Sequence, residues 1–200
     1  TGIFDDGRWF DILIEYGKVT TEELAIRITA VDRGPEPAAL HVLPTVWFRN
    51  TWSWGREPST RPVCTAVDGP AGTLCLRADD TALELDPRMP ADYRLGGRWL
   101  VAEAAPGGRI LATDNETNGP LVFGAGHMSR SPFTKDAFHR LLCDGDTEAV
   151  NPSGRGTKLC IHREWIVPPG GSVAMHLLLT DRPPADALPA GGASLQAVVE

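Results

Sequence analysis

The chain has 200 residues, 42% of them hydrophobic and 22% charged, which is ordinary for one globular domain with a sizeable core. Its formal net charge of −7 argues against nucleic acid as a partner, because neutralising phosphates requires a basic surface. No apolar run approaches the roughly 20 residues of a membrane span and no signal peptide is recognisable, so we expect a cytoplasmic protein without a membrane partner.

Strand patterns dominate the first quarter of the chain. Residues 10–16 and the cleanly alternating run 24–31 are expected to be strands joined by a polar loop. A turn rich in Gly and Pro at 32–37 then leads into a near-continuous apolar strand at 38–48. Such a continuous apolar run is typical of a strand that is covered on both faces.

Short strand patterns continue along the rest of the chain. We expect strands at 63–67, 73–78, 81–85, 99–104, 109–113 and 121–124. The clearest hairpin joins 157–167 to 172–180 through a Pro-Pro-Gly-Gly turn, and the one plausible helix lies at 134–142. The predicted fold is therefore all-β: an antiparallel two-sheet β-sandwich with one short helix.

The four cysteines give no metal signature, because the chain has no C-x-x-C pair and no Cys/His cluster at ligand spacing. We expect no metal and no cofactor. Cys64 and Cys75 lie symmetrically about a turn and can face each other across a hairpin. The interpretation we favour is that both are small buried hydrophobes, as are Cys143 and Cys160, since thiols inside the cell stay reduced.

The most informative stretch is 47–55, which holds three of the six tryptophans. Trp52 and Trp54 lie two residues apart and should share one face of an extended chain, beside Arg49 and Asn50. Two indoles placed in this way have two plausible roles. They cap the end of a sandwich core, or they form a flat platform for a sugar ring or a second domain.

A dense polar loop at 113–119 contains Asn115, Glu116 and Asn118. Side chains of this kind can hydrogen-bond sugar hydroxyls, with Glu116 as a conceivable general acid. The alternative is that the loop satisfies its own backbone groups, which Asx-rich loops do more often.

A second polar cluster covers 131–139. Lys135 and Asp136 can form ion pairs that order this loop, and His139 follows Lys135 by one helical turn, where a structural role is commoner than a catalytic one. A third segment, 149–158, is rich in glycine but lacks the spacing of a phosphate loop. The chain contains no G-x-S-x-G, H-E-x-x-H or G-x-G-x-x-G motif, and no pair of carboxylates is singled out by its spacing. We therefore assign no catalytic residue.

Several of these runs together resemble a known family. The runs 4–11, 28–35, 40–55, 115–118, 135–139 and 149–158 are similar, in order and spacing, to the amino-terminal region of large bacterial proteins of the glycoside hydrolase family 63 type. The resemblance covers nearly the whole chain. It implies a β-sandwich of the supersandwich, galactose mutarotase-like kind, followed by an (α/α)6 barrel whose two catalytic acids hydrolyse α-glucosidic or related bonds with inversion.

The resemblance also implies a domain organisation. Residues 1–182 would form the sandwich, truncated at its start because Thr1 is not an initiator methionine, and residues 183–200 would be a linker towards the catalytic barrel. The chain would have no hydrolase activity of its own. Its candidates for the surface that contacts the barrel, or that binds sugar, are Arg49, Asn50, Trp52, Trp54, Asn115, Glu116, Asn118, Lys135, Asp136 and His139.

Two other functions remain open at this point. A stand-alone carbohydrate-binding module would use the tryptophans and the loop 115–118. A mutarotase-like sugar epimerase would require His41, His127, His162 and Glu116 to converge in one cleft. A sandwich that lacks partner strands would also expose an unpaired edge and an uncovered apolar face, which invites strand addition or self-association.

Overall fold

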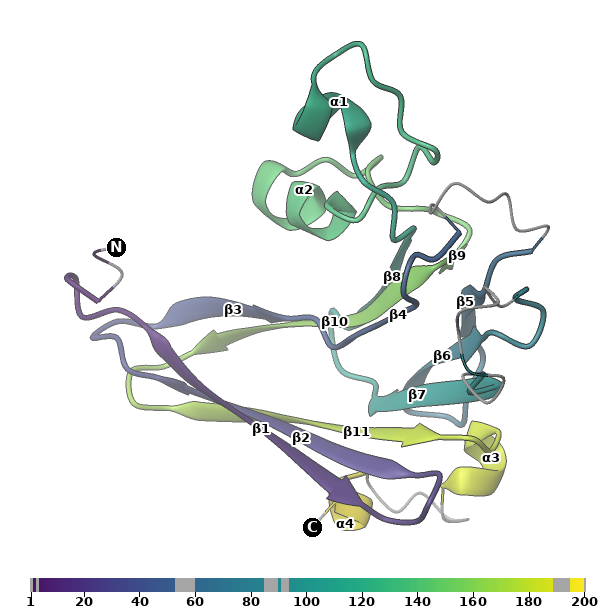
Figure 1. The fold of residues 1–200 in the computed structure, drawn as a ribbon. Coiled ribbons are helices and arrows are strands. Elements are labelled where there is room, and N and C mark those ends of the chain that lie inside the picture. The colour runs from purple at the N-terminus through teal and green to yellow at the C-terminus, as the bar shows by residue number, and fades with distance from the viewer. Residues whose placement is uncertain are drawn as a thin grey trace.

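Two antiparallel sheets packed face to face form a β-sandwich, which confirms the predicted fold class (Figure 1). The structure is a computed structural model, and it describes residues 2, 4–52, 60–84, 90, 94–188 and 195–199. The larger sheet has seven strands. In spatial order they are β1 (Phe10–Lys18), β2 (Leu24–Asp32), β11 (Ser172–Thr180), β7 (Gly97–Glu103), β6 (Thr73–Asp79), β5 (Val63–Val67) and β9 (Arg155–Gly156).

The smaller sheet is built around the long strand β10 (Lys158–Val167). Strand β8 (Arg109–Thr113) pairs with one edge of it, and β3 (Ala38–Val42) and β4 (Thr45–Trp47) follow each other along the opposite edge. The expected strand 38–48 is thus formally two strands. Their register against β10 is nevertheless continuous, and the Pro44 carbonyl accepts a hydrogen bond from the Ile161 amide at 3.1 Å. The interruption arises because proline has no N–H to donate.

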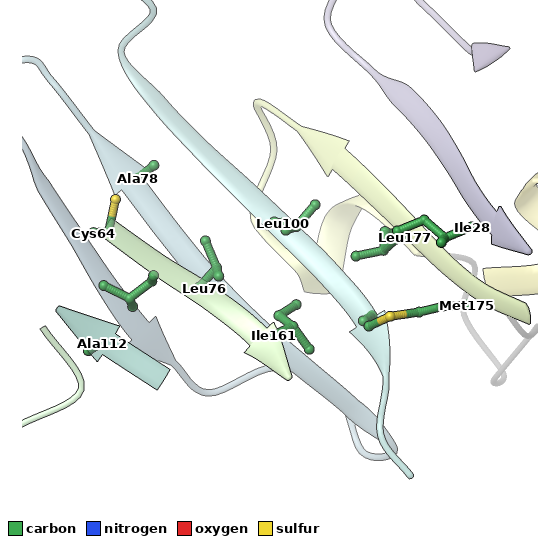
Figure 2. Packing of buried hydrophobic residues seen from close by; sticks show 11 residues of the cluster. Ile28, Cys64, Leu76, Ala78, Leu100, Ala112, Ile161, Met175 and Leu177 are labelled. Atoms are coloured by element: carbon green, nitrogen blue, oxygen red, sulfur yellow. The ribbon is translucent and has the colours of Figure 1, made fainter. Parts of the chain in front are cut away.

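The main core lies between the two sheets. Its buried side chains come from both layers, with Leu159 and Ile161 of β10 facing Met175 and Leu177 of β11 through one apolar cluster (Figure 2). This arrangement contradicts the expected hairpin. Strands β10 and β11 belong to different sheets, and the turn between them carries the chain across the sandwich, because only that path buries both apolar rows against each other.

Short helices cover the outer faces of both sheets. Helix α2 (Ala137–Asp144) packs Phe138 against Leu111 and Cys160 of the small sheet. Helices α3 (Pro184–Ala187) and α4 (Leu195–Val199) lie on the large sheet, where Leu195 joins a buried cluster. The described part of the expected linker therefore packs on the sandwich, while a domain beyond it stays a prediction.

Two strand assignments are wrong. Residues 121–124, expected as a strand, lie mostly in helix α1 (Gly119–Phe123), because Asn118 caps this helix and Pro120 occupies its first turn. Residues 81–84 of the expected strand 81–85 form a turn and irregular chain, and residue 85 lies outside the described residues. The expectation of one helix is also too low, since the described part of the chain contains four.

The cysteines are all free. Cys64 lies opposite Ala78, whereas Cys75 lies opposite Val67, so the two thiols point to opposite faces of the sheet and the alternative in which they face each other is wrong. Both are buried, as the favoured interpretation expects. Burial raises the pKa of the Cys64 thiol to about 12, in keeping with a small buried hydrophobe. Cys160 is buried as expected, but Cys143 is exposed on helix α2.

Candidate functional site

The described candidate residues gather at one end of the small sheet. Trp47 at the end of β4 and Thr113 at the end of β8 both lie opposite Lys158, the first residue of β10. The segments that follow them, 48–52 and 114–118, therefore leave the sheet close together. Helices α1 and α2 stand over this end of the molecule (Figure 1).

Trp52 and Glu116 form the centre of this site. The Trp52 indole donates its Nε1–H to Glu116 Oε1 at 2.6 Å, and Asn50 Nδ2 donates to the Asn115 carbonyl at 2.8 Å and to Glu116 Oε2 at 3.4 Å. Trp52 is 2% exposed and Glu116 is 3% exposed. Arg61 lies 3.7 Å from the same carboxylate. With both oxygens engaged and buried, Glu116 has no open face on which to act as a general acid in the described part of the chain.

The polar side chains of the loop after β8 are hydrogen-bonded to neighbouring backbone and side-chain groups. Asp114 accepts hydrogen bonds from the Thr157 amide at 2.9 Å and the Ser131 hydroxyl at 2.7 Å. Asn115 Nδ2 donates to the Phe48 carbonyl at 2.9 Å. These bonds tie the loop to the start of β10 and to the segment after β4. The Gly-rich segment has a steric role here, since a Cβ on Gly156 would overlap the Thr113 carbonyl oxygen.

Asn118 and Asp136 join helices α1 and α2. Asn118 Nδ2 donates to Asp136 Oδ2 at 2.9 Å, and the Thr134 hydroxyl donates to the other carboxylate oxygen at 2.5 Å. Burial acts to raise the pKa of Asp136, but these two hydrogen bonds outweigh it, so the pKa lies below its usual value. The expected ordering of this loop thus comes from Asp136 through neutral donors, while the Lys135 amide donates to the Glu116 carbonyl at 2.9 Å.

The remaining described candidates, Arg49, Lys135 and His139, are exposed. The His139 ring contacts Cys143 Sγ, which lies 3.6 Å from Nδ1 and one turn along helix α2. Trp54 lies outside the described residues, so the pairing of its indole with Trp52 stays a prediction.

Two features of this region escaped the sequence reasoning. The Trp47 indole is exposed, which the sequence did not predict. Strand alternation explains it once the core is known, because Val46 and Phe48 pack on the inner core and Trp47 then points outward. The segment after Asn118 also exposes four large apolar side chains, a feature hidden by its interpretation as a strand. They are Leu121, Val122, Phe123 and Met128.

The residues required for a mutarotase-like site do not form one cluster. His41 Nδ1 and His162 Nε2 lie 3.0 Å apart on the small sheet. Glu116 binds Trp52, and the His127 ring packs beside Phe123. Burial, followed by nearby positive charge, lowers the pKa of His162. No group of three or more His, Cys, Asp or Glu side chains in the described ranges could hold a metal ion.

The fold and this site define a β-sandwich domain whose one end carries a helical extension with a buried polar centre. No protein-family model matches the chain. The chain is similar to an uncharacterized protein of Saccharomyces cerevisiae, YMR196W, with 29% identity over 202 residues that cover 89% of this chain. It spans 17% of the yeast protein's length and resembles an amino-terminal portion of it. No helix in the described ranges is long and apolar enough to cross a membrane.

Proposed function

We propose that this chain is a non-catalytic β-sandwich domain of a larger glycoside hydrolase of the family 63 type, which packs on an (α/α)6 catalytic barrel of the same parent protein. The sequence resemblance supplies the family. The similarity to a portion of a much longer yeast protein supports the view that such a sandwich is one part of a larger protein.

The observation that carries the docking role is the exposed apolar surface of the α1 segment, residues 119–128. Its four large apolar side chains are between 59% and 92% exposed. Several exposed large apolar side chains so close together in the sequence favour a contact with another protein element, because leaving apolar surface in water is unfavourable. The segment therefore suits a covered position against a second domain.

Hydrogen bonds at the base of helix α1 hold the α1 segment in place for this contact. The Asn118 side chain accepts a hydrogen bond from the Leu121 amide at 3.3 Å while donating to Asp136. The Gly119 amide donates to the Ser129 hydroxyl at 2.9 Å, which closes the base of the loop. A docking segment anchored at its base loses less conformational entropy on binding than a free loop does.

Activity assays test the domain assignment. The chain alone and the longer parent protein are compared on α-linked disaccharides, with turnover expected from the parent alone. Comparable turnover by the isolated chain would contradict the proposal.

In the parent, Leu121→Ser with Phe123→Ser should uncouple the thermal unfolding of sandwich and barrel, whereas the matched control Ile166→Ser, also at an exposed apolar residue, should not. Equal behaviour of the two variants would place the docking surface elsewhere.

A stand-alone carbohydrate-binding module is the second candidate. The observation in its favour is the exposed Trp47 indole, which lines an open pocket with Asn115 and Lys135. Calorimetric titration with oligosaccharides discriminates the two functions. Oligosaccharide binding by the isolated chain, with unchanged turnover of the parent protein when this binding is abolished, would favour the module. The absence of heat at millimolar oligosaccharide would count against it.

A further inference from the structure

The outer face of the small sheet carries an open pocket beside the polar centre. Thr45 and Trp47 lie two residues apart on β4, and Trp47 lies opposite Lys158, so all three side chains share this face. Asn115 and Lys135 complete the lining of a pocket of about 340 Å³. The Trp47 indole is 56% exposed, which leaves much of its ring open to a ligand.

Positive charge accumulates at this pocket. Lys158 is half-buried, with its ammonium group 5.0 Å from the centre of the Phe138 ring and donating to the Lys135 carbonyl at 2.8 Å. Burial lowers the pKa of Lys158, and the charge of Lys135 lowers it further. The carboxylate that acts on Lys158 is Asp136, which is already hydrogen-bonded to Thr134 and Asn118.

Cys160 adds no negative charge beside Lys158. Burial raises the pKa of its thiol to about 12, so the sulfur is neutral at pH 7. The charged groups that act on Lys158 are thus the Lys135 ammonium group and the Asp136 carboxylate, and a ligand that brings a further negative charge would be attracted to both lysines. Such a ligand would gain most at Lys135, whose side chain is exposed.

We infer that this pocket binds a sugar ring that bears a carboxylate, with the apolar face of the ring on the Trp47 indole and the carboxylate at the Lys135 ammonium group. A flat exposed indole suits the C–H face of a pyranose. Asn115 Nδ2 donates to the Phe48 carbonyl and the Thr45 hydroxyl donates to the Leu43 carbonyl, so Asn115 Oδ1 and Thr45 Oγ1 would act towards ring hydroxyls as acceptors. The inference does not rest on the docking proposal, because its residues differ from the exposed apolar residues of the α1 segment.

The combination of groups separates this ligand from simpler ones. A small inorganic anion would make no use of the indole, and a neutral sugar would make no use of the lysine charge. A nucleic acid phosphate is disfavoured by the net charge of −7 over the whole chain. The pocket therefore predicts an order of affinity in which an acidic sugar exceeds a neutral sugar, and both exceed a bare carboxylate.

Titration of the chain with D-glucuronate, D-glucose and acetate tests this order, with the indole N–H signals followed by ¹H–¹⁵N NMR. We expect D-glucuronate to bind about tenfold more tightly than D-glucose and to shift the signal that Trp47→Ala removes. Lys135→Met should reduce the affinity for D-glucuronate to the affinity for D-glucose. Trp47→Ala should abolish binding of both sugars, while Trp9→Ala, another exposed tryptophan, should leave it intact.

Three results would overturn the inference. The first is the absence of any shift of the Trp47 signal with D-glucuronate, and the second is equal binding of acetate and glucuronate. The third is an unchanged preference for glucuronate in Lys135→Met. The two hypotheses fail separately. If the chain binds D-glucuronate but the longer parent protein shows no glycosidase turnover, the proposed domain assignment is contradicted and the inference about the pocket is not.

Discussion

At the scale of single residues, the Trp52–Glu116 hydrogen bond should stabilise the fold. Both side chains are buried and their atoms lie 2.6 Å apart. Trp52→Phe leaves a buried carboxylate short of a donor, and Glu116→Gln removes the charge that strengthens the bond. We expect each to lower the free energy of unfolding by about 1–3 kcal/mol, with a coupling of about 1 kcal/mol in the double variant, measured by urea denaturation.

The control for this cycle is Trp47→Phe. The Trp47 indole is exposed, so its replacement should change the free energy of unfolding by about 0.5 kcal/mol or less. Additive effects of Trp52→Phe and Glu116→Gln would show that the short N–H to carboxylate bond contributes little beyond packing.

Glu23 should give a pH-dependent contribution to stability. Hydrogen bonds from Arg182 lower its pKa below the usual 4.5, against the opposing effect of burial, and Thr180 adds to the lowering. A lowered folded-state pKa stabilises the fold above the unfolded-state value, and this contribution disappears as the pH falls through the folded-state pKa. Glu23→Gln should therefore cost about 1 kcal/mol at pH 7, reduced because Arg182 is half exposed.

Measuring the free energy of unfolding of the wild type and of Glu23→Gln from about pH 3 to 7 checks the direction of this pH dependence. The two stability curves should converge at the acidic end and separate as the pH rises. A constant difference between them at every pH would mean that Glu23 acts through packing and not through its charge.

Residue burial was only partly predictable from the sequence. Burial of Trp52 was one of two open alternatives, since a Trp beside Arg and Asn suits a core cap and a platform equally well. Its partner Glu116 lies 64 positions away, and no local pattern connects them. The exposure of Trp47 was not predicted, because the run 38–48 is almost wholly apolar and was expected to be covered on both faces, so strand alternation could not show which of its side chains are exposed.

At the scale of elements, the base of helix α1 gives a third prediction. Aspartate normally caps a helix as well as asparagine does, yet Asn118→Asp would set a second carboxylate against Asp136. We expect the cap to weaken by roughly 1 kcal/mol at pH 7, so that hydrogen exchange of the amides of Leu121, Val122 and Gly124 becomes about fivefold faster.

Asn118→Ala is the matched variant, because it removes the cap without adding charge. Its exchange rates, corrected for intrinsic chemistry, should not recover on acidification, whereas those of Asn118→Asp should approach the wild type once one carboxyl is protonated. Slower exchange in Asn118→Asp at neutral pH would show that the Asp136 contact does not govern this helix.

Element type was readable wherever the hydrophobic period was long and failed where turn chemistry competed with it. The nine-residue strand β2 alternates over most of its length and was predicted almost to its ends. The short run 121–124 has apolar residues but sits directly behind an Asn-Gly-Pro start, and the cap prevailed over the apolar run. The β10–β11 turn looked like a hairpin because sequence shows a turn but not which sheet each strand joins.

At the scale of the whole molecule, the core-side face of strand β1 is only partly covered by the small sheet. β1 is an edge strand of the large sheet, paired with β2 alone in the described ranges. Ile14 lies opposite the buried Ile28 and so faces the core side, yet it is 48% exposed, because the small sheet does not reach this far. Asp11 and Glu15 on the other face are already paired with Arg33 and Arg27.

Such an edge offers unpaired backbone groups and apolar side chains to another strand, which favours association between chains. We expect the chain to self-associate as its concentration rises, and Ile14→Lys to weaken this association at least about tenfold by adding an inward charge to the edge. Sedimentation velocity measures both. Ile166→Lys, an exposed isoleucine on the central strand β10, should associate like the wild type. A monomer at all concentrations, or equal effects of the two lysines, would show that β1 does not mediate self-association.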